Sequence, residues 1–242
     1  MTGIDVSKWQ GHIDWSKVKG KVDFAILRAG YGNTAKQKDS FFEEYYTGCK
    51  ANGIPVGAYW YSYATSIADA EKEADACIQC LAGKQFEFPI YFDIEDSTQG
   101  SFSKSLKTSM VIAFCNKLEK AGYYAGWYTY TSWALSGFDL EKLSRFTFWL
   151  ADYRLGYNKT LTRDMHQFSS SGRIDGIDGR VDLNTCTKDF PTIIKRAGLN
   201  GYSVDSDKKM SKITFAAMSA GDAKKVKALG DSLKLEYKEE EV

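Results

Sequence analysis

The feature that most constrains the fold is an alternation of strand-like and helix-like segments over residues 3–153. Buried strands are predicted for the apolar, β-branched and aromatic runs at 3–9, 22–31, 54–64, 88–96, 123–132 and 146–153. Helical patterns lie between several of these runs, at 40–52, 66–82 and 102–121. This alternation predicts an α/β fold with a mostly parallel sheet and crossover helices.

The alternation of strand-like and helix-like segments ends after residue 153. A strand-like segment that begins at His166 is followed by the glycine-punctuated segment 173–182, which is typical of a hairpin rather than of another strand–helix unit. A helical segment at 190–197 then ends at Gly198. A barrel that begins with repeated strand–helix units and closes with antiparallel strands fits this order.

Two acidic residues stand at the end of the most apolar strand-like run, 88–96. Residues two apart on a strand point to the same face, so Asp93 and Glu95 would be separated by roughly 6.6 Å along it. Neighbouring carboxylates raise each other's pKa, which suits a general acid with a stabilising partner. From this segment alone, a solvated strand end with Asp96 as the next helix cap explains the pattern equally well.

Further polar and aromatic residues fall in the other predicted strands or in the closing segment. In barrels of this kind, functional side chains lie at the carboxyl ends of the strands, so these residues are expected to meet on one face. Half of the aromatic residues must fill the barrel, whereas strand-embedded carboxylates are hard to place in a core. The residues are Asp5, Tyr59, Tyr61, Tyr63, Trp127, Tyr128, Trp149, Asp152, Gln167 and Asp182.

Charge and cysteine content exclude several classes of protein. A net charge of +1 gives no electrostatic footprint for nucleic acid or an anionic membrane, and no apolar run is long enough to span a bilayer. Five scattered cysteines, including the pair Cys77 and Cys80, are expected to be buried reduced thiols. The opening residues contain neither a basic nor an apolar signal region, so synthesis in the cytoplasm without a signal peptide is expected.

Five ordered motifs resemble glycoside hydrolase family 25, the lysozymes (N-acetylmuramidases) of phages, bacteria and fungi. They are Gly-Ile-Asp-Val-Ser at 3–7, Ile-Leu-Arg-Ala-Gly-Tyr-Gly at 26–32, Gly-Ala-Tyr-Trp-Tyr-Ser-Tyr-Ala at 57–64, Asp-Ile-Glu at 93–95 and Gly-Arg-Val-Asp-Leu-Asn at 179–184. The resemblance spans residues 2–197 and implies a modified β/α barrel with eight strands and fewer helices. It also implies cleavage of the β-1,4 bond between N-acetylmuramic acid and N-acetylglucosamine in peptidoglycan.

The resemblance assigns roles to individual residues. Glu95 matches the general acid/base, Asp93 its acidic neighbour, and Asp5 and Asp182 the two further acids of the groove. Positions that contact sugar or catalytic groups are matched by Tyr61, Trp60, Tyr128 and Gln167. Arg28 is expected either to balance the acidic cluster or to hold Asp5 in place. Neither a metal nor a cofactor is expected.

Three routes of glycoside cleavage remain open from the sequence. Carboxyl separations of about 5–5.5 Å suit retention, those of about 6.5–9.5 Å suit inversion, and the strand spacing lies near the boundary. In a third route the acetamide oxygen of the substrate attacks, Glu95 protonates the glycosidic oxygen, and Asp93 orients the acetamide. We favour the third route as a hypothesis.

The residue composition of the chain changes after residue 198. The barrel is assigned to 1–198, a polar linker to 199–211 and a small βαβ unit to 212–242, with strands at 212–219 and 234–241 around a helix at 221–233. So short a unit buries too little surface to be stable alone, so it should pack on the barrel, pair in a homodimer, or begin a longer domain. A cell-wall-binding or dimerisation module is expected.

Two rival functions are a catalytically silent glycan-binding barrel and another β-hexosaminidase activity such as chitin cleavage. The first would be expected to lack an acid, whereas Asp5, Asp93, Glu95 and Asp182 are all present. The expected partner is bacterial peptidoglycan, without nucleic acid or membrane insertion. The expected biology is that of a phage or prophage endolysin, which reaches the wall after holin-type release.

Overall fold

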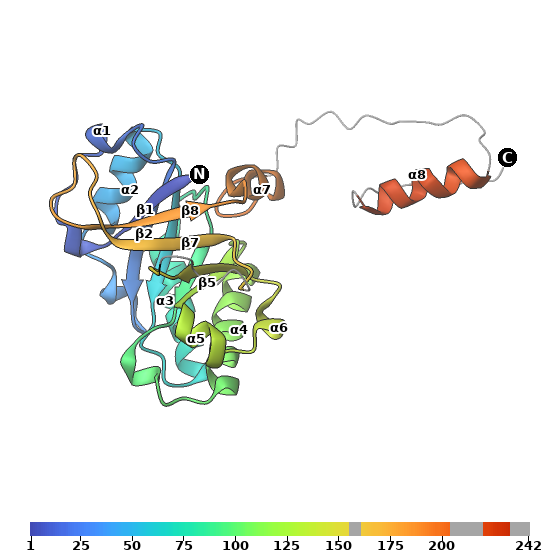
Figure 1. The fold of residues 1–242 in the computed structure, drawn as a ribbon, viewed down its shortest axis with the longest axis horizontal. Helices are drawn as coiled ribbons and strands as arrows, with labels where there is room; N and C mark the ends of the chain where they lie inside the picture. Colours follow the sequence, from blue (N-terminus) through green and yellow to red (C-terminus); the bar gives the residue numbers. More distant parts are fainter. Residues whose placement is uncertain (155–160, 204–219, 233–242) are drawn as a thin grey trace. The chain divides into compact units, whose positions relative to one another are not determined.

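The computed structural model describes residues 1–154, 161–203 and 220–232 (Figure 1). The chain divides into two compact units, Met1–Asp205 and Ser206–Val242. The first unit is a closed barrel of eight strands in chain order. Its strands are β1 Thr2–Val6, β2 Phe24–Tyr31, β3 Val56–Tyr61, β4 Ile90–Asp93, β5 Ala125–Tyr130, β6 Thr147–Ala151, β7 Met165–Gly172 and β8 Val181–Cys186.

Strands β1 to β7 run parallel to their chain neighbours, whereas β8 is antiparallel to both β7 and β1. The chain therefore closes its barrel with a hairpin, as the end of the alternation after residue 153 predicts. The predicted modified barrel with eight strands and fewer helices is confirmed.

Helices and short 3-10 turns of the barrel unit connect the strands and cover the outside of the barrel (Figure 1). The three helices predicted between the first strands are present as α2 (Phe42–Ala51), α3 (Ile67–Leu81) and α4 (Lys104–Lys120). Serine side chains cap α3 and α4 by accepting from Asp69 N and Leu106 N. The helical elements are η1 Lys8–Gln10, α1 Trp15–Val18, η2 Ala35–Gln37, α2 Phe42–Ala51, α3 Ile67–Leu81, η3 Ser97–Gln99, α4 Lys104–Lys120, α5 Thr131–Ser136, α6 Leu140–Leu143 and α7 Phe190–Ala197.

Aromatic side chains fill the interior of the barrel in layers. Phe24 and Phe88 stack with ring centroids 4.4 Å apart, and the Trp149 ring lies 5.2 Å from Tyr91 and 4.6 Å from Tyr128. Gly126 makes room for this packing, because a Cβ there would lie 2.7 Å from the Tyr91 ring. The filled interior leaves polar side chains to gather at the carboxyl ends of the strands.

The barrel unit continues beyond the predicted boundary at residue 198. Helix α7 ends at Gly198, whose φ of 63° is the left-handed conformation that favours glycine. Asn200, next but one, is fully buried, and its side chain bonds Phe86 O at 3.2 Å, Phe88 O at 2.8 Å and Tyr124 N at 2.7 Å. The first residues of the predicted linker 199–211 are thus part of the barrel unit.

In the second unit, the structure describes helix α8, Ala220–Ser232, in place of the predicted helix 221–233. The strands predicted at 212–219 and 234–241 lie outside the described residues, so the βαβ arrangement stays a prediction. No helix among the described residues is long and apolar enough to cross a membrane.

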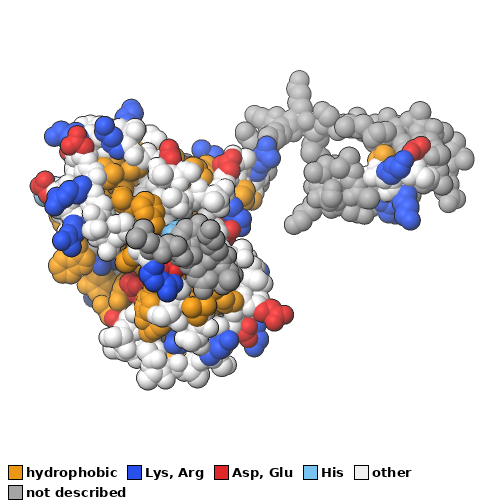
Figure 2. Space-filling model, viewed as in Figure 1, with side chains coloured by type: hydrophobic (Ala, Val, Ile, Leu, Met, Phe, Trp, Pro, Cys, Tyr) orange, Lys and Arg blue, Asp and Glu red, His pale blue; other side chains and the backbone are white. Residues whose placement is uncertain are grey.

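On the visible face of the barrel unit, basic and acidic side chains are interspersed (Figure 2). The five cysteines are free and buried, which confirms the predicted structural thiols.

Candidate active site

The four acids predicted to form the site lie on β1, at the beginning of β8, and at the end of β4 and just beyond it, all at the carboxyl end of the barrel. Asp5 on β1 is the register partner of Asp182 on β8, and Asp93 is the last residue of β4. Glu95 lies two residues beyond β4, so its placement inside a strand was wrong. The alternation nevertheless continues, because Ile94 is fully buried and its N–H donates to Tyr128 O at 3.1 Å.

Asp5 is the most firmly held of these acids. It is 4% exposed, and its Oδ2 accepts hydrogen bonds from Gln167 Nε2 at 2.9 Å and Asn184 Nδ2 at 2.7 Å. Burial and the charge of Asp182 raise the pKa of Asp5 well above its usual range, against the lowering effect of these two donors. A hydrogen bond between the two carboxyl groups adds to the rise in the pKa of Asp5, and burial raises the pKa of Asp182 as well.

Gln167 links Asp5 to the aromatic wall of the site. Its Oε1 accepts from the hydroxyls of Tyr128 at 3.0 Å and Tyr153 at 2.5 Å, which leaves the amide nitrogen to donate to Asp5. Asn184 is oriented in the same way, since its Oδ1 accepts from Trp149 Nε1 at 2.8 Å. Both amides are therefore fixed as donors toward Asp5.

Asn184 and Tyr153 were not among the predicted site residues. A signal for Asn184 is present in the sequence, because it lies two residues after Asp182 on β8 and so on the same face of the strand. Tyr153 lies two residues after β6, at the end of the strand where functional residues of such barrels lie.

Asp93 is buried with one oxygen free of hydrogen bonds. It is 4% exposed, and its Oδ1 has no hydrogen-bond partner. Burial, followed by the charges of Glu95 and Asp5, raises the pKa of Asp93 well above its usual range, while Arg28 opposes the shift. A buried carboxyl oxygen without a donor is costly, which marks it as a group with a use beyond the fold.

Glu95 is half-buried beside Asp93. Burial is the main cause that raises the pKa of Glu95 to about 7, and the charges of Asp182 and Asp96 raise it further. The nearby Tyr128 hydroxyl opposes this shift and lowers the pKa of Glu95. Glu95 can thus carry a proton near neutral pH, as a general acid must.

Arg28 does not hold Asp5. Its Nε donates to Asp39 Oδ2 at 2.7 Å, and both side chains are largely withdrawn from solvent. The guanidinium nevertheless lies close enough to Asp93 to lower the pKa of that carboxyl. Of the two predicted roles, the position of Arg28 agrees with balancing the acidic cluster.

Trp60 was wrongly placed among the residues that contact sugar. It is 0% exposed, packs in the layer between barrel and helices, and donates from Nε1 to Gly32 O at 2.8 Å. The period of two along β3 turns Trp60 outward and Tyr59 and Tyr61 inward. A side chain buried under the helices cannot reach a glycan.

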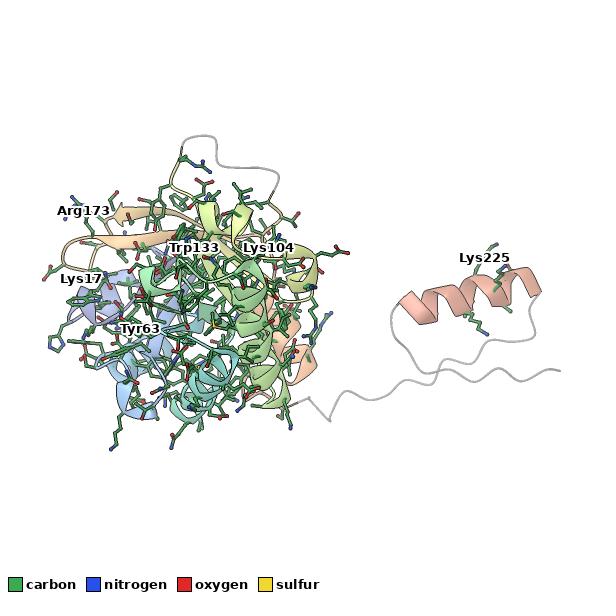
Figure 3. The ribbon with its side chains drawn as sticks, turned by 90° about the horizontal axis from the view of Figure 1, so that it is seen from below. Lys17, Tyr63, Lys104, Trp133, Arg173 and Lys225 are labelled. Atoms are coloured by element: carbon green, nitrogen blue, oxygen red, sulfur yellow. The ribbon has the colours of Figure 1, made fainter. Side chains whose placement is uncertain are left out.

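Tyr61 lies at the rim of the site. Its hydroxyl donates to Asp96 Oδ2 at 3.1 Å, one residue beyond Glu95. Its ring centroid is 5.1 Å from that of Tyr63, which is 48% exposed in the loop after β3 (Figure 3). The structure thus brings Tyr61, Tyr128 and Gln167 to the acidic cluster, as the sequence predicted, and excludes Trp60.

Within the described ranges 1–154, 161–203 and 220–232, no three His, Cys, Asp or Glu side chains are arranged to hold a metal ion. The chemistry that these residues can perform is proton transfer. Glu95 can donate a proton, and Asp93 beside it offers an unpartnered acceptor oxygen.

Comparison with known proteins gives consistent matches to one family. Residues 4–177 match the model of Glycosyl hydrolases family 25. The autolytic lysozyme of Clostridium acetobutylicum is 28% identical over 186 residues, which cover 76% of this chain and 55% of that protein, so this chain spans about half of that relative.

Solved structures of a lysozyme and of an endolysin catalytic domain share the fold. A lysozyme from Streptomyces coelicolor superposes with a TM-score of 0.70 and 26% identity, covering 84% of this chain and 98% of that chain. The catalytic domain of endolysin ply40 from bacteriophage P40 of Listeria monocytogenes gives a TM-score of 0.69 at 25% identity, covering 80% of this chain and 96% of that chain.

Proposed function

The chain belongs to Glycosyl hydrolases family 25, so its barrel is a glycoside hydrolase of the lysozyme type, and we propose that it cleaves the β-1,4 bond between N-acetylmuramic acid and N-acetylglucosamine in peptidoglycan. The observation that carries the proposal is the pair of buried Asp93 and half-buried Glu95, flanked by Asp5 and Asp182 at the carboxyl end of the barrel.

Glu95 is the proposed general acid. The leaving glycosidic oxygen must be protonated as its bond to the sugar breaks, and a carboxyl group with a pKa of about 7 supplies a proton near neutral pH. The same group is the base that later receives a proton from water or from the attacking group. The Tyr128 hydroxyl lies beside this carboxyl group and favours its ionised form once the proton has been given.

Asp93 is the proposed partner of the acetamide group of the substrate. An N-acetyl sugar brings its own nucleophile, the acetamide oxygen, and the amide N–H then becomes more acidic as positive charge develops. The unpartnered Oδ1 of Asp93 is an acceptor that suits this N–H. The acetamido-assisted route therefore needs no rearrangement of Asp93, and retention through this route is the expected stereochemical outcome.

Asp5, Asp182, Tyr61, Tyr128, Gln167 and Arg28 are the proposed substrate-binding and supporting residues. The amide donors on Asp5 and the tyrosine donors on Gln167 form one connected set, which keeps the acids in place when substrate displaces water. A silent glycan-binding barrel would not need four acids with raised pKa values, which favours an enzyme.

The biological role that we propose is that of a phage or prophage endolysin. The likeness to the catalytic domain of endolysin ply40 supports this role, in which the enzyme reaches the wall after holin-type release. For the unit after the barrel we propose cell-wall binding or homodimer formation. Sedimentation of the full chain, compared with residues 1–203, separates these two, because only dimer formation changes the mass of the particle in solution.

Digestion of purified peptidoglycan and of chitin, followed by mass analysis of the reducing ends, tests the proposed specificity. The proposal predicts new reducing ends on N-acetylmuramic acid. New reducing ends on N-acetylglucosamine, or cleavage of chitin at a comparable rate, would instead support another β-hexosaminidase. Binding to peptidoglycan without any release of fragments would support the silent barrel.

A further inference from the structure

A buried polar cluster outside the four acids joins the two loops beside Glu95. Its members are Ser62 in the loop after β3, Glu73 on α3 and Gln99 on η3, each at most 1% exposed. Gln99 Nε2 lies 3.2 Å from Ser62 Oγ and 3.0 Å from Ala64 O, and so ties the loop after β4 to the loop after β3.

The Glu73 carboxylate is the acceptor at the centre of this cluster. Its Oε1 accepts from Tyr63 N at 2.8 Å, and the neighbouring Ser62 side chain and Ala64 backbone lower the pKa of its carboxyl group. The Ser62 oxygen in turn accepts from Ala64 N at 3.1 Å. Glu73 thus holds the middle residue of this loop, and the residues on either side are tied to each other and to Gln99.

Keeping a carboxylate in this position is costly. Burial raises the pKa of Glu73 to about 7 in spite of the donors around it, and its Oε2 has no hydrogen-bond partner. An apolar residue would fill the same space without this cost, but it would leave the Tyr63 amide without an acceptor. The carboxylate therefore serves the geometry of the loop.

The loop that Glu73 holds presents an aromatic shelf, which we define as Tyr31, Tyr61 and Tyr63. The Tyr63 ring lies 5.1 Å from Tyr61 and 6.1 Å from Tyr31. The backbone N–H of Ser62, between Tyr61 and Tyr63, donates to Asp93 O at 2.9 Å, so the shelf is anchored to the strand end that carries the catalytic pair.

We propose that Glu73 is a positioning residue, whose carboxylate sets the loop after β3 so that the aromatic shelf stands beside Glu95 in the orientation that binds the glycan. This inference rests on the proposed function for the identity of the ligand. Glu73 does not touch the reacting atoms. Its effect is on the affinity for substrate, because the shelf offers ring faces to sugars while Glu95 and Asp93 keep their own contacts.

The test is the variant Glu73→Met, with Glu71→Met as the matched control, since Glu71 is exposed on the same helix. Methionine keeps the length of the side chain but removes the acceptor of the Tyr63 amide. With soluble peptidoglycan fragments we expect KM to rise about tenfold, as for loss of one hydrogen bond to a charged group, while kcat stays within about threefold. Ser62→Ala, a smaller change, should raise KM by about threefold.

Amide hydrogen exchange of the peptide that spans residues 61–66 is a second measurement that needs no substrate. Exchange should be faster in Glu73→Met than in Glu71→Met. Unchanged exchange, an unchanged KM, or a loss confined to kcat in both Glu73→Met and Ser62→Ala would overturn the proposal. If the wild-type protein does not hydrolyse peptidoglycan, the proposed function fails, and the exchange measurement still decides whether Glu73 holds the loop.

Discussion

Asp5 on β1 and Asp182 on β8 are register partners across the seam that closes the barrel, and their carboxyl groups share a hydrogen bond. The antiparallel β8 makes this possible, because the carboxyl end of β1 then meets the beginning of β8. Asp182 thereby stands close enough to Glu95 for its charge to raise the pKa of the proposed acid.

The activity should depend on pH through Glu95. Protonated Glu95 is required, so kcat should fall as pH rises through a value of about 7. Asp182→Asn removes a negative charge that raises the pKa of Glu95, so this fall should move to lower pH. A profile of kcat against pH for both proteins checks the shift, with the exposed Asp178→Asn as control. A fall that stays in place or moves to higher pH would contradict the proposed coupling.

Gln167 should matter for both stability and turnover. Gln167→Leu removes the donor to Asp5 and the acceptor of two tyrosine hydroxyls, and we expect a loss of about 1–3 kcal/mol in the free energy of unfolding. We expect kcat to fall roughly tenfold or more, because Asp5 loses its orientation. Urea unfolding and turnover measurements check both. If the Gln167→Leu protein is as stable as the wild type and has the same kcat, Gln167 does not contribute to the site.

Trp60 and Tyr61 should respond to substitution in opposite ways. Trp60→Ala should cost about 3–5 kcal/mol of unfolding free energy because it empties a buried site, whereas Trp60→Phe should fold with nearly unchanged KM. Tyr61→Phe removes the hydrogen bond to Asp96 at the rim and should raise KM. A strong rise in KM for a well-folded Trp60→Phe would restore Trp60 to the substrate-binding set.

Asn200 should be one of the residues that stabilise the barrel unit from outside its strands. Asn200→Gly keeps the left-handed backbone conformation, with φ of 55°, and removes three side-chain hydrogen bonds. The expected loss is about 2–4 kcal/mol, since the Tyr124 amide and two carbonyls lose their partners. Chemical unfolding of residues 1–203 with and without the substitution measures it. If the loss in free energy of unfolding is no larger than for a substitution at an exposed position, residues 199–203 do not stabilise the barrel and belong to the predicted linker.

Local patterns predicted most of the fold. The runs at 22–31 and 123–132 contain β2 and β5, and the segment 190–197 matches α7 because Gly198 supplies the conformation that ends it. The positions of Asp5 and Asp93 followed from the rule that parallel strands of a barrel end on one face, whereas Asp182 reaches that face because β8 is antiparallel. What these predictions share is dependence on residues near in sequence.

The remaining features depend on contacts between distant segments. The partner of Arg28 is Asp39, eleven residues away, and that pairing needs the loop after β2 to fold back. The amides on Asp5 come from β7 and β8, more than 160 residues away. Trp60 is different, because the alternation of Tyr59, Tyr61 and Tyr63 already places it on the other face of β3. The resemblance placed it in the site against that pattern.

The most direct test of the proposed mechanism is the variant Glu95→Gln with purified peptidoglycan, using release of reducing ends as the measurement. Glutamine keeps the shape of the side chain and its place beside Tyr128 but cannot donate the proton, so hydrolysis should fall by roughly a hundredfold or more with the thermal midpoint little changed. Hydrolysis near the wild-type rate by the folded variant would show that Glu95 is not the acid.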